Sequence, residues 1–228
     1  MILGDPKILA FAFLGGIGPA LFWLWFWLQE GRKKPQPKGL LLLIFILGMM
    51  AVIFVLPIQK LIQDYLSSYG WQLLSWATAE EIVKYLAVII VVYNMREIKS
   101  PVDWPIYMIT AALGFAALEN AIFLIQPLSL GETTVGLLTG ELRFLGSTLL
   151  HAVSSGIIGI ALGLSLHFKK SRIGLYFAIS LLLAITLHST FNFFIIENNG
   201  SDFLKVFAFL WVVTIIVMLL FEKLRREE

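Results

Sequence analysis

The chain alternates between long apolar runs and short polar segments. The apolar runs are about 20 residues long, which is the length that an α-helix needs to cross the hydrocarbon core of a bilayer. Charged residues, glycines and prolines stand between them. The pattern predicts about seven membrane-spanning helices, at approximately 8–29, 39–58, 71–94, 103–126, 143–167, 173–196 and 203–221.

Composition agrees with this pattern. Hydrophobic residues make up 59% of the chain and its mean hydropathy is +0.87, against roughly 45–50% apolar residues in soluble domains. The 228 residues accommodate the seven spans with short connections. We therefore expect an all-α, polytopic transmembrane helix bundle that forms one integral-membrane domain over residues 1–228. Such a protein is a multi-pass component of the cell membrane, surrounded by the lipid bilayer.

Charge and cysteine content exclude some classes of function. A net charge of +2 is too small to indicate a nucleic-acid partner. The chain contains no cysteine, which excludes thiol catalysis, disulfides and cysteine-based metal sites. The sequence does not indicate an oligomeric state.

Lysine and arginine orient the bundle, because positively charged loops stay in the cytoplasm. Every second connection is rich in these residues, and the other connections are poor in them. The basic side carries Arg32, Lys33, Lys34, Lys38, Arg96, Lys99, Lys169, Lys170, Arg172, Lys223, Arg225 and Arg226. The opposite side carries Lys7, Lys60, Arg143 and Lys205. We therefore expect the N-terminus outside and the C-terminus in the cytoplasm.

Several polar side chains lie inside the predicted spans. A charge within the hydrocarbon costs about 3 kcal/mol, so such residues indicate function or pairing. The residues concerned are Glu80, Glu81, Lys84, Glu119, Asn120, His151, His188 and Asn192. Counted from the predicted outer ends of four different helices, Glu80, Glu119, His151 and His188 lie at nearly the same depth, and Asn192 lies one turn closer to the outside. The coincidence predicts one water-filled site that opens outward.

The third span contains two carboxylates and one ammonium. Lys84 follows Glu80 by four residues and Glu81 by three, and both separations bring side chains together on a helix. One of the two glutamates can pair with Lys84, and the other remains as a candidate acid or base. The spacing does not say which is which. Asn120 is interpreted as a supporting residue that hydrogen-bonds between helices.

These residues resemble the motifs of a known protein family. Glu80-Glu81-Ile82-Val83-Lys84 is similar to the EExxK motif of the PrsW intramembrane proteases. Phe115 to Asn120 is similar to their FxxxEN segment. His151-Ala152 and the segment from His188 to Asn192 resemble their two later histidine motifs. The resemblance covers nearly the whole chain, with the motifs in order.

The PrsW proteins are in turn similar to the type II CAAX prenyl proteases, which carry EExxxR, FxxxH and HxxxN motifs. This chain departs from that second pattern, because Lys84 stands one residue earlier than the arginine and Glu119 stands where the histidine would be. The resemblance therefore implies the PrsW branch. It implies a membrane-embedded endopeptidase that makes the first cut in a single-pass membrane protein such as an anti-sigma factor. That cut falls near the extracytoplasmic side.

A glutamic-type mechanism can be assigned to the polar residues. Glu80 is expected to act as general base on a water held between it and Glu119, with Glu81 pairing Lys84. His188 and Asn192 lie one turn apart and are expected to stabilise the oxyanion. His151 would orient the water or the substrate carbonyl. Ser154 and Ser155, close to His151, offer a less favoured nucleophile.

No cofactor is expected on this reading, but zinc is an alternative. Two histidines with one or two glutamates form a reasonable zinc set. Against zinc, the chain contains no HExxH pair, and the positive charge of Lys84 beside the glutamates would oppose a cation.

Two readings other than a protease use the same residues. Carboxylates and histidines in a membrane also form the proton relays of proton-coupled transporters. No inverted repeat supports a transporter in this sequence. In a non-catalytic scaffold, the polar groups would only tie helices together. A Glu80→Gln substitution separates the last reading from a protease, because only a protease would lose its activity.

Overall fold

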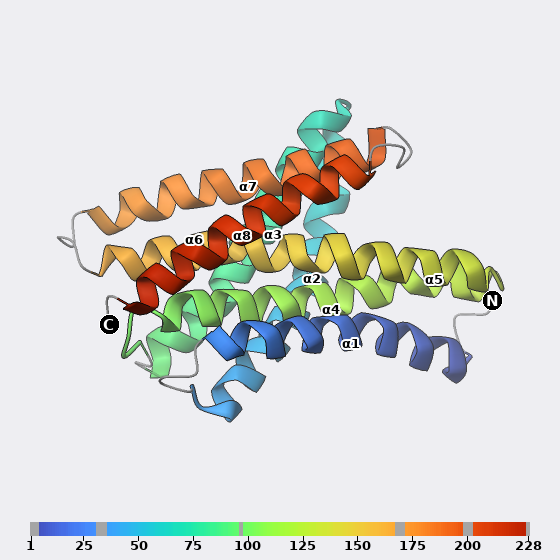
Figure 1. Ribbon diagram of the computed structural model, residues 1–228. Helices are drawn as coiled ribbons and strands as arrows, with labels where there is room; N and C mark the ends of the chain where they lie inside the picture. Colours follow the sequence, from blue (N-terminus) through green and yellow to red (C-terminus); the bar gives the residue numbers. More distant parts are fainter. Residues whose placement is uncertain (1–4, 31–35, 96–97, 167–171, 198–202, 227–228) are drawn as a thin grey trace.

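The structure is a computed structural model that describes residues 5–30, 36–95, 98–166, 172–197 and 203–226 (Figure 1). Helices occupy nearly all of these ranges. They are α1 (Pro6–Glu30), α2 (Lys38–Tyr65), α3 (Tyr69–Met95), α4 (Asp103–Ser129), α5 (Thr133–Leu142), the π-helical turn η1 (Arg143–Ser147), α6 (Thr148–Ser165), α7 (Ile173–Glu197) and α8 (Phe203–Arg226).

The predicted all-α bundle is confirmed. Because α5, η1 and α6 follow one another directly, the described chain forms seven long helical segments. Six of them are long and apolar enough to cross a membrane. The seventh, α3, has 27 residues but holds Glu80, Glu81 and Lys84 at its centre. The start of α1 and the end of α8 lie at opposite ends of the bundle (Figure 1), as an odd number of crossings requires. Which end faces the cytoplasm stays a prediction.

Three helix ends differ from the sequence-based boundaries. Helix α2 continues to Tyr65 instead of ending near residue 58. Helix α4 continues to Ser129, with Pro127 in its last turn. Proline lacks a backbone N–H, so one hydrogen bond of this last turn is not made, and the helix ends two residues later. Helix α5 occupies 133–142, where the sequence predicted a polar connection. The polar residues at these ends are helical, and several of them line a cavity, as described below.

Some predictions fall outside the described residues. They concern the end of the fifth span at His167 and six of the basic residues used for orientation. These six are Arg32, Lys33, Lys34, Arg96, Lys169 and Lys170.

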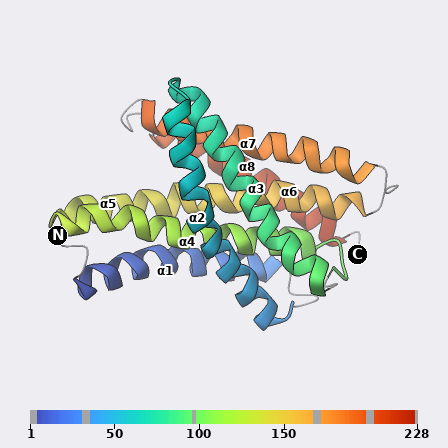
Figure 2. The ribbon, with the colours of Figure 1, turned by 180° about the vertical axis from the view of Figure 1, so that it is seen from behind.

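Helix α4 lies at the centre of the bundle and contacts α1, α2 and α6. Its middle is rich in buried small residues, which allow neighbouring helices to approach closely. Figure 2 shows α2 crossing α4 steeply. At the crossing, a Cβ atom on Gly48 would overlap the carbonyl oxygen of Ala111, and one on Gly114 would overlap that of Phe45. The two backbones therefore touch at this point, which fixes α2 relative to α4.

Gly48→Ala should accordingly destabilise the protein by about 1–3 kcal/mol, because the added methyl group forces the two backbones apart. Thermal unfolding in detergent measures the effect as a lowered Tm. Gly39→Ala is the matched control, because no atom of the described residues lies within 4 Å of a Cβ atom built there. Equal Tm values for the two variants would contradict the close contact.

Candidate active site

A cavity of about 1440 Å³ opens between the ends of α2, α4, α5, α7 and α8. Its position is the end of the bundle that the lysine and arginine distribution predicts to face outward. Six aromatic side chains form much of its wall: Trp76, Phe115, Phe123, Phe191, Phe203 and Phe207. Polar residues from the extended helix ends also line it: Gln59, Lys60, Gln63, Asp64, Gln126 and Glu141. The deepest polar wall consists of Glu80, Glu119, His151, His188 and Asn192, with Arg143 beside them.

Glu80 of α3 presents one free carboxylate oxygen to this cavity. Its Oε1 atom accepts a hydrogen bond from Gln59 Nε2 of α2, at 2.9 Å. Its Oε2 atom is buried and has no hydrogen-bond partner among the described residues. His188 Nε2 lies 3.5 Å from this oxygen, and His151 Nδ1 and Lys84 Nζ each lie 3.9 Å from it. A buried polar atom without a partner is costly, so Oε2 is the oxygen of Glu80 that is available to a bound group.

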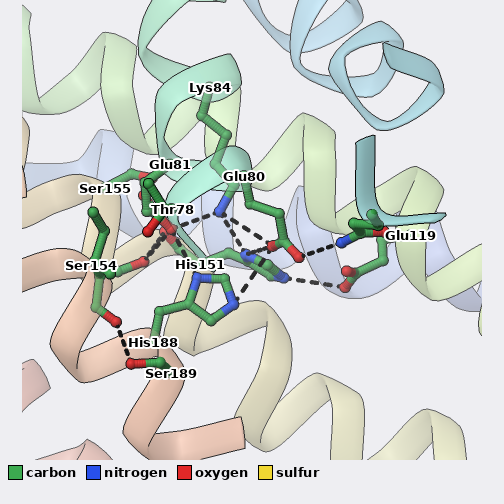
Figure 3. A network of polar contacts seen from close by, with 12 residues as sticks. Thr78, Glu80, Glu81, Lys84, Glu119, His151, Ser154, Ser155, His188 and Ser189 are labelled. Atoms are coloured by element: carbon green, nitrogen blue, oxygen red, sulfur yellow. Dashed lines mark hydrogen bonds and ion pairs between the residues drawn. The ribbon is translucent and has the colours of Figure 1, made fainter. Parts of the chain in front are cut away.

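Glu81 is directed away from the cavity into a dense network (Figure 3). Its Oε1 atom is contacted by Lys84 Nζ at 2.7 Å, by His188 Nδ1 at 2.9 Å and by the Ser154 hydroxyl at 3.0 Å. The Ser155 hydroxyl donates to its Oε2 atom at 2.8 Å. Glu81, Lys84 and both serines are fully buried. The network ties α3 to α6 and α7 and satisfies both oxygens of the carboxylate.

His151 of α6 is held between a cation and a carboxylate. Lys84 Nζ lies 2.8 Å from its Nδ1 atom, and Glu119 Oε2 lies 3.1 Å from its Nε2 atom. An ammonium group can only donate a hydrogen bond, so Nδ1 accepts and Nε2 carries the proton. In the same way, His188 Nδ1 donates to Glu81, which leaves its Nε2 atom with a lone pair.

Three acceptor atoms therefore converge beside the cavity: Glu80 Oε2, His188 Nε2 and His151 Nδ1. Of these, His151 Nδ1 already accepts a hydrogen bond from Lys84 Nζ. Glu80, His151 and His188 each offer one ligand atom, and these atoms lie within 4.8 Å of one another. The second nitrogen of each ring faces a carboxylate, which is the usual arrangement around histidines that bind a metal. The three residues thus fit a metal ion as a donor set. The same arrangement fits a protonated carboxyl group or a bound water.

Arg143, in the π turn, completes the site on the other side of Glu119. It forms an ion pair with Glu119 Oε2, and its Nε atom donates to Asn120 Oδ1 at 2.5 Å. Asn120 in turn donates to Thr148 Oγ1 at 2.8 Å. The guanidinium carbon lies 4.0 Å from the centre of the Phe123 ring. Asn120 therefore hydrogen-bonds between helices, as the sequence predicted.

Most of the residues predicted from the sequence meet in one cluster. Glu80, Glu119, His151 and His188 border the cavity directly. Glu81 and Lys84 lie behind its wall and hold the histidines. Asn192 lines the cavity one turn from His188.

Sequence reasoning missed Arg143 and Gln59 as members of the site, and it gave Ser154 and Ser155 a different role. Arg143 was counted only as a charge on the outer side, and Gln59 was placed in a connection. Ser154 and Ser155 were considered as nucleophiles, but their hydroxyls donate to Glu81. Their positions three and four residues after His151 place them on the same helix face, which is the signal that could have assigned them to the network.

Comparison with known proteins identifies relatives along most of the chain. A family described as "PrsW family intramembrane metalloprotease" matches residues 36–221. A protein named protease PrsW from Oceanobacillus iheyensis is 30% identical over 210 residues, covering 88% of this chain and 91% of the relative. Proteins of the same name from Geobacillus kaustophilus and Bacillus subtilis are 28% and 26% identical. They cover 81% and 86% of this chain, and the matches cover 79% and 88% of those relatives. No solved structure matches significantly.

Proposed function

The chain belongs to the PrsW family of intramembrane proteases, and we propose that it hydrolyses a peptide bond of a membrane protein at the Glu80 end of the cavity. The proposal rests mainly on one observation. Glu80 Oε2 is a buried carboxylate oxygen to which no group in the described part of the chain donates a hydrogen bond. Glu80 lines the cavity, and two histidine rings lie next to this oxygen.

In this proposal Glu80, and not Glu81, is the general base. Both oxygens of Glu81 are already occupied by donors from Lys84, His188 and the two serines. Glu80 Oε2 can instead accept a proton from a water in the cavity as the water oxygen attacks the substrate carbonyl carbon. Gln59 holds the other oxygen of Glu80 at 2.9 Å, which orients the carboxylate toward the water.

The proton taken from water can move between Glu80 Oε2 and His188 Nε2, which are 3.5 Å apart. From there it is delivered to the leaving amine nitrogen, so that the peptide C–N bond breaks with balanced protons. The Asn192 amide, one turn further along α7, donates to the oxyanion, with protonated His188 as a second donor. Glu119 and Lys84 hold His151 on the opposite side of the water.

The proposed substrate is a single-pass membrane protein such as an anti-sigma factor, cut near its extracytoplasmic side. The position of the cavity supports this class, because its polar mouth is formed by the α2, α4, α5 and α7 ends opposite the basic loops. Its aromatic walls suit an apolar segment. The test is to reconstitute the pure protein in liposomes with candidate single-pass substrates and to locate the cut by mass spectrometry. An intact substrate with every candidate, together with measured solute transport, would favour the transporter reading instead.

Zinc is a second candidate for activating the water, because Glu80, His151 and His188 fit a metal as donors. A zinc ion there would supply a hydroxide at neutral pH. Glu81 and Glu119 would orient the two rings through their second nitrogens. We favour the direct mechanism, in which Glu80 activates the water without a metal, because Lys84 Nζ lies 2.8 Å from His151 Nδ1. The ammonium group occupies the side of the ring that a metal would need.

The direct mechanism predicts that a chelator leaves cleavage unchanged in protein shown to be metal-free by elemental analysis. The rate per enzyme molecule should stay within about twofold of the untreated protein, a free-energy difference of about 0.4 kcal/mol. Loss of cleavage with the chelator, and its return on adding zinc, would assign the metal mechanism.

A further inference from the structure

The π turn η1 brings Arg143 to a position that an uninterrupted α-helix would not give it. Arg143 and His151 are eight residues apart, and in a regular α-helix this separation rotates two side chains by about 80° from one another. In η1, the Thr148 N–H donates to the Arg143 carbonyl five residues earlier. The turn thus accommodates one extra residue, and the two side chains come within about 20° of the same face. Both then contact Glu119 Oε2.

Helix α1 stabilises this turn from outside the site. In an α-helix the Phe144 carbonyl would accept the Thr148 N–H, which here donates to Arg143 instead. The Phe144 carbonyl accepts the Trp23 indole N–H, at 3.2 Å. The rings of Phe22 and Trp23 also pack on the Phe144 ring, with centroids 5.5 and 6.0 Å away. Contacts with α1 therefore stabilise the π turn.

Arg143 is anchored at several points at once. Its guanidinium group contacts Glu119 and Asn120, two neighbouring residues of α4, and lies over the Phe123 ring. Two adjacent donors of one planar group fix both the direction and the distance of Glu119. A lysine could supply the charge but not the pair of donors.

The position of Glu119 in turn determines the orientation of His151, through the contact between Glu119 Oε2 and His151 Nε2. Arg143 and His151 Nε2 share the same oxygen of Glu119, so a displaced Glu119 would also release the ring. With Nε2–H donated to Glu119, the Nδ1 atom keeps its lone pair toward Glu80 and Lys84. We propose that Arg143 is a positioning residue for peptide hydrolysis, which acts through Glu119 to fix the orientation of the His151 ring, while Lys84 fixes its tautomer. This inference rests on the proposed function.

Kinetics of purified variants with a cleaved single-pass substrate test the inference. Arg143→Met should lower kcat about 10–100-fold, as loss of an outer hydrogen-bond partner commonly does, with KM unchanged. Arg143→Lys should recover part of the loss. In a Glu119→Gln background, Arg143→Met should cause little further loss, because the two residues act as one unit. A raised KM and full additivity would mean that Arg143 binds the substrate, and would overturn the inference.

A spectroscopic measurement tests the same point without activity. In ¹⁵N-histidine spectra, wild-type His151 should show one sharp Nε2–H signal and an unprotonated Nδ1. Arg143→Met should shift and broaden the Nε2–H signal, because Glu119 no longer holds the ring in one orientation. Trp23→Phe, which removes the indole N–H while keeping an aromatic ring, should shift the spectrum in the same direction if Arg143→Met proves too unstable to purify. An unchanged His151 signal in both variants would also overturn the inference.

The matched control is Arg225→Met, which breaks an arginine–glutamate pair with Glu222 at the far end of α8. It should cleave like the wild type. The experiments distinguish a failure of this inference from a failure of the proposed function. Arg143→Met with wild-type kinetics and spectra would reject only the role of Arg143. Unimpaired cleavage by Glu80→Gln would reject the proposed catalytic site.

Discussion

Glu80→Gln should lower kcat by about 10²–10⁴-fold, the usual contribution of a general base, and leave the Tm close to that of the wild type. The amide cannot accept the proton of the attacking water. Its carbonyl oxygen can still accept the hydrogen bond from Gln59, and its NH₂ group can donate toward His188 Nε2. The fold therefore keeps its contacts while the chemistry is lost. Cleavage of a reconstituted single-pass substrate measures the effect.

The control for this variant is Glu132→Gln, the same change at an exposed glutamate between α4 and α5. It should cleave at the wild-type rate. If Glu80→Gln retained most of its activity, Glu80 would not be the base. The polar cluster would then serve to hold the helices together, as in the scaffold reading.

Lys84→Met, unlike Glu80→Gln, should cause a large loss of stability. Lys84 and Glu81 are both fully buried, and their charged atoms lie 2.7 Å apart. Removing the ammonium group leaves the Glu81 carboxylate without its counter-charge in a medium that solvates it poorly. Breaking a buried pair in this way costs about 3–5 kcal/mol. Thermal unfolding in detergent, followed by tryptophan fluorescence, should show a clearly lower Tm.

Two further variants make this result specific. Lys84→Met combined with Glu81→Gln should regain much of the lost stability, because no unpaired charge is then buried. Lys60→Met, at an exposed position of α2, should keep the wild-type Tm. A Lys84→Met protein as stable as the wild type would contradict the view that this pair holds α3 against α6 and α7.

The helices were predictable because a membrane leaves a chain few alternatives. Backbone groups in hydrocarbon must pair within the segment, so each long apolar run becomes a helix. The ends of α2 and α5 were not predictable by the same rule. Gln59 and Asp64 look like a connection in the sequence, yet they are helical and face a cavity. Hydropathy cannot distinguish polar residues in a loop from polar residues beside water inside a bundle.

The core of the candidate site was predictable from depth alone. Glu80, Glu119, His151 and His188 lie at matching positions of four helices, and the structure brings them together. Arg143 was missed because its spacing from His151 is out of phase for an α-helix. Only the π turn restores the phase, and that turn depends on Trp23, a residue more than a hundred positions away. Contacts of this kind cannot be read from local spacing.

The backbone contact between α2 and α4 at Gly48 also determines how the cavity responds to its contents. Beyond that contact, α2 extends to Tyr65 as a lever arm of about 26 Å, so a tilt of about 5° moves its tip by about 2 Å. Gln59 lies on this arm and holds Glu80 Oε1. The Gln59 backbone carbonyl also accepts the indole N–H of Trp76 in α3, at 3.0 Å. We therefore expect an occupant that tilts this part of α2 away from α3 to lengthen the hydrogen bond from Gln59 to Glu80, which would couple the width of the entrance to the orientation of the carboxylate.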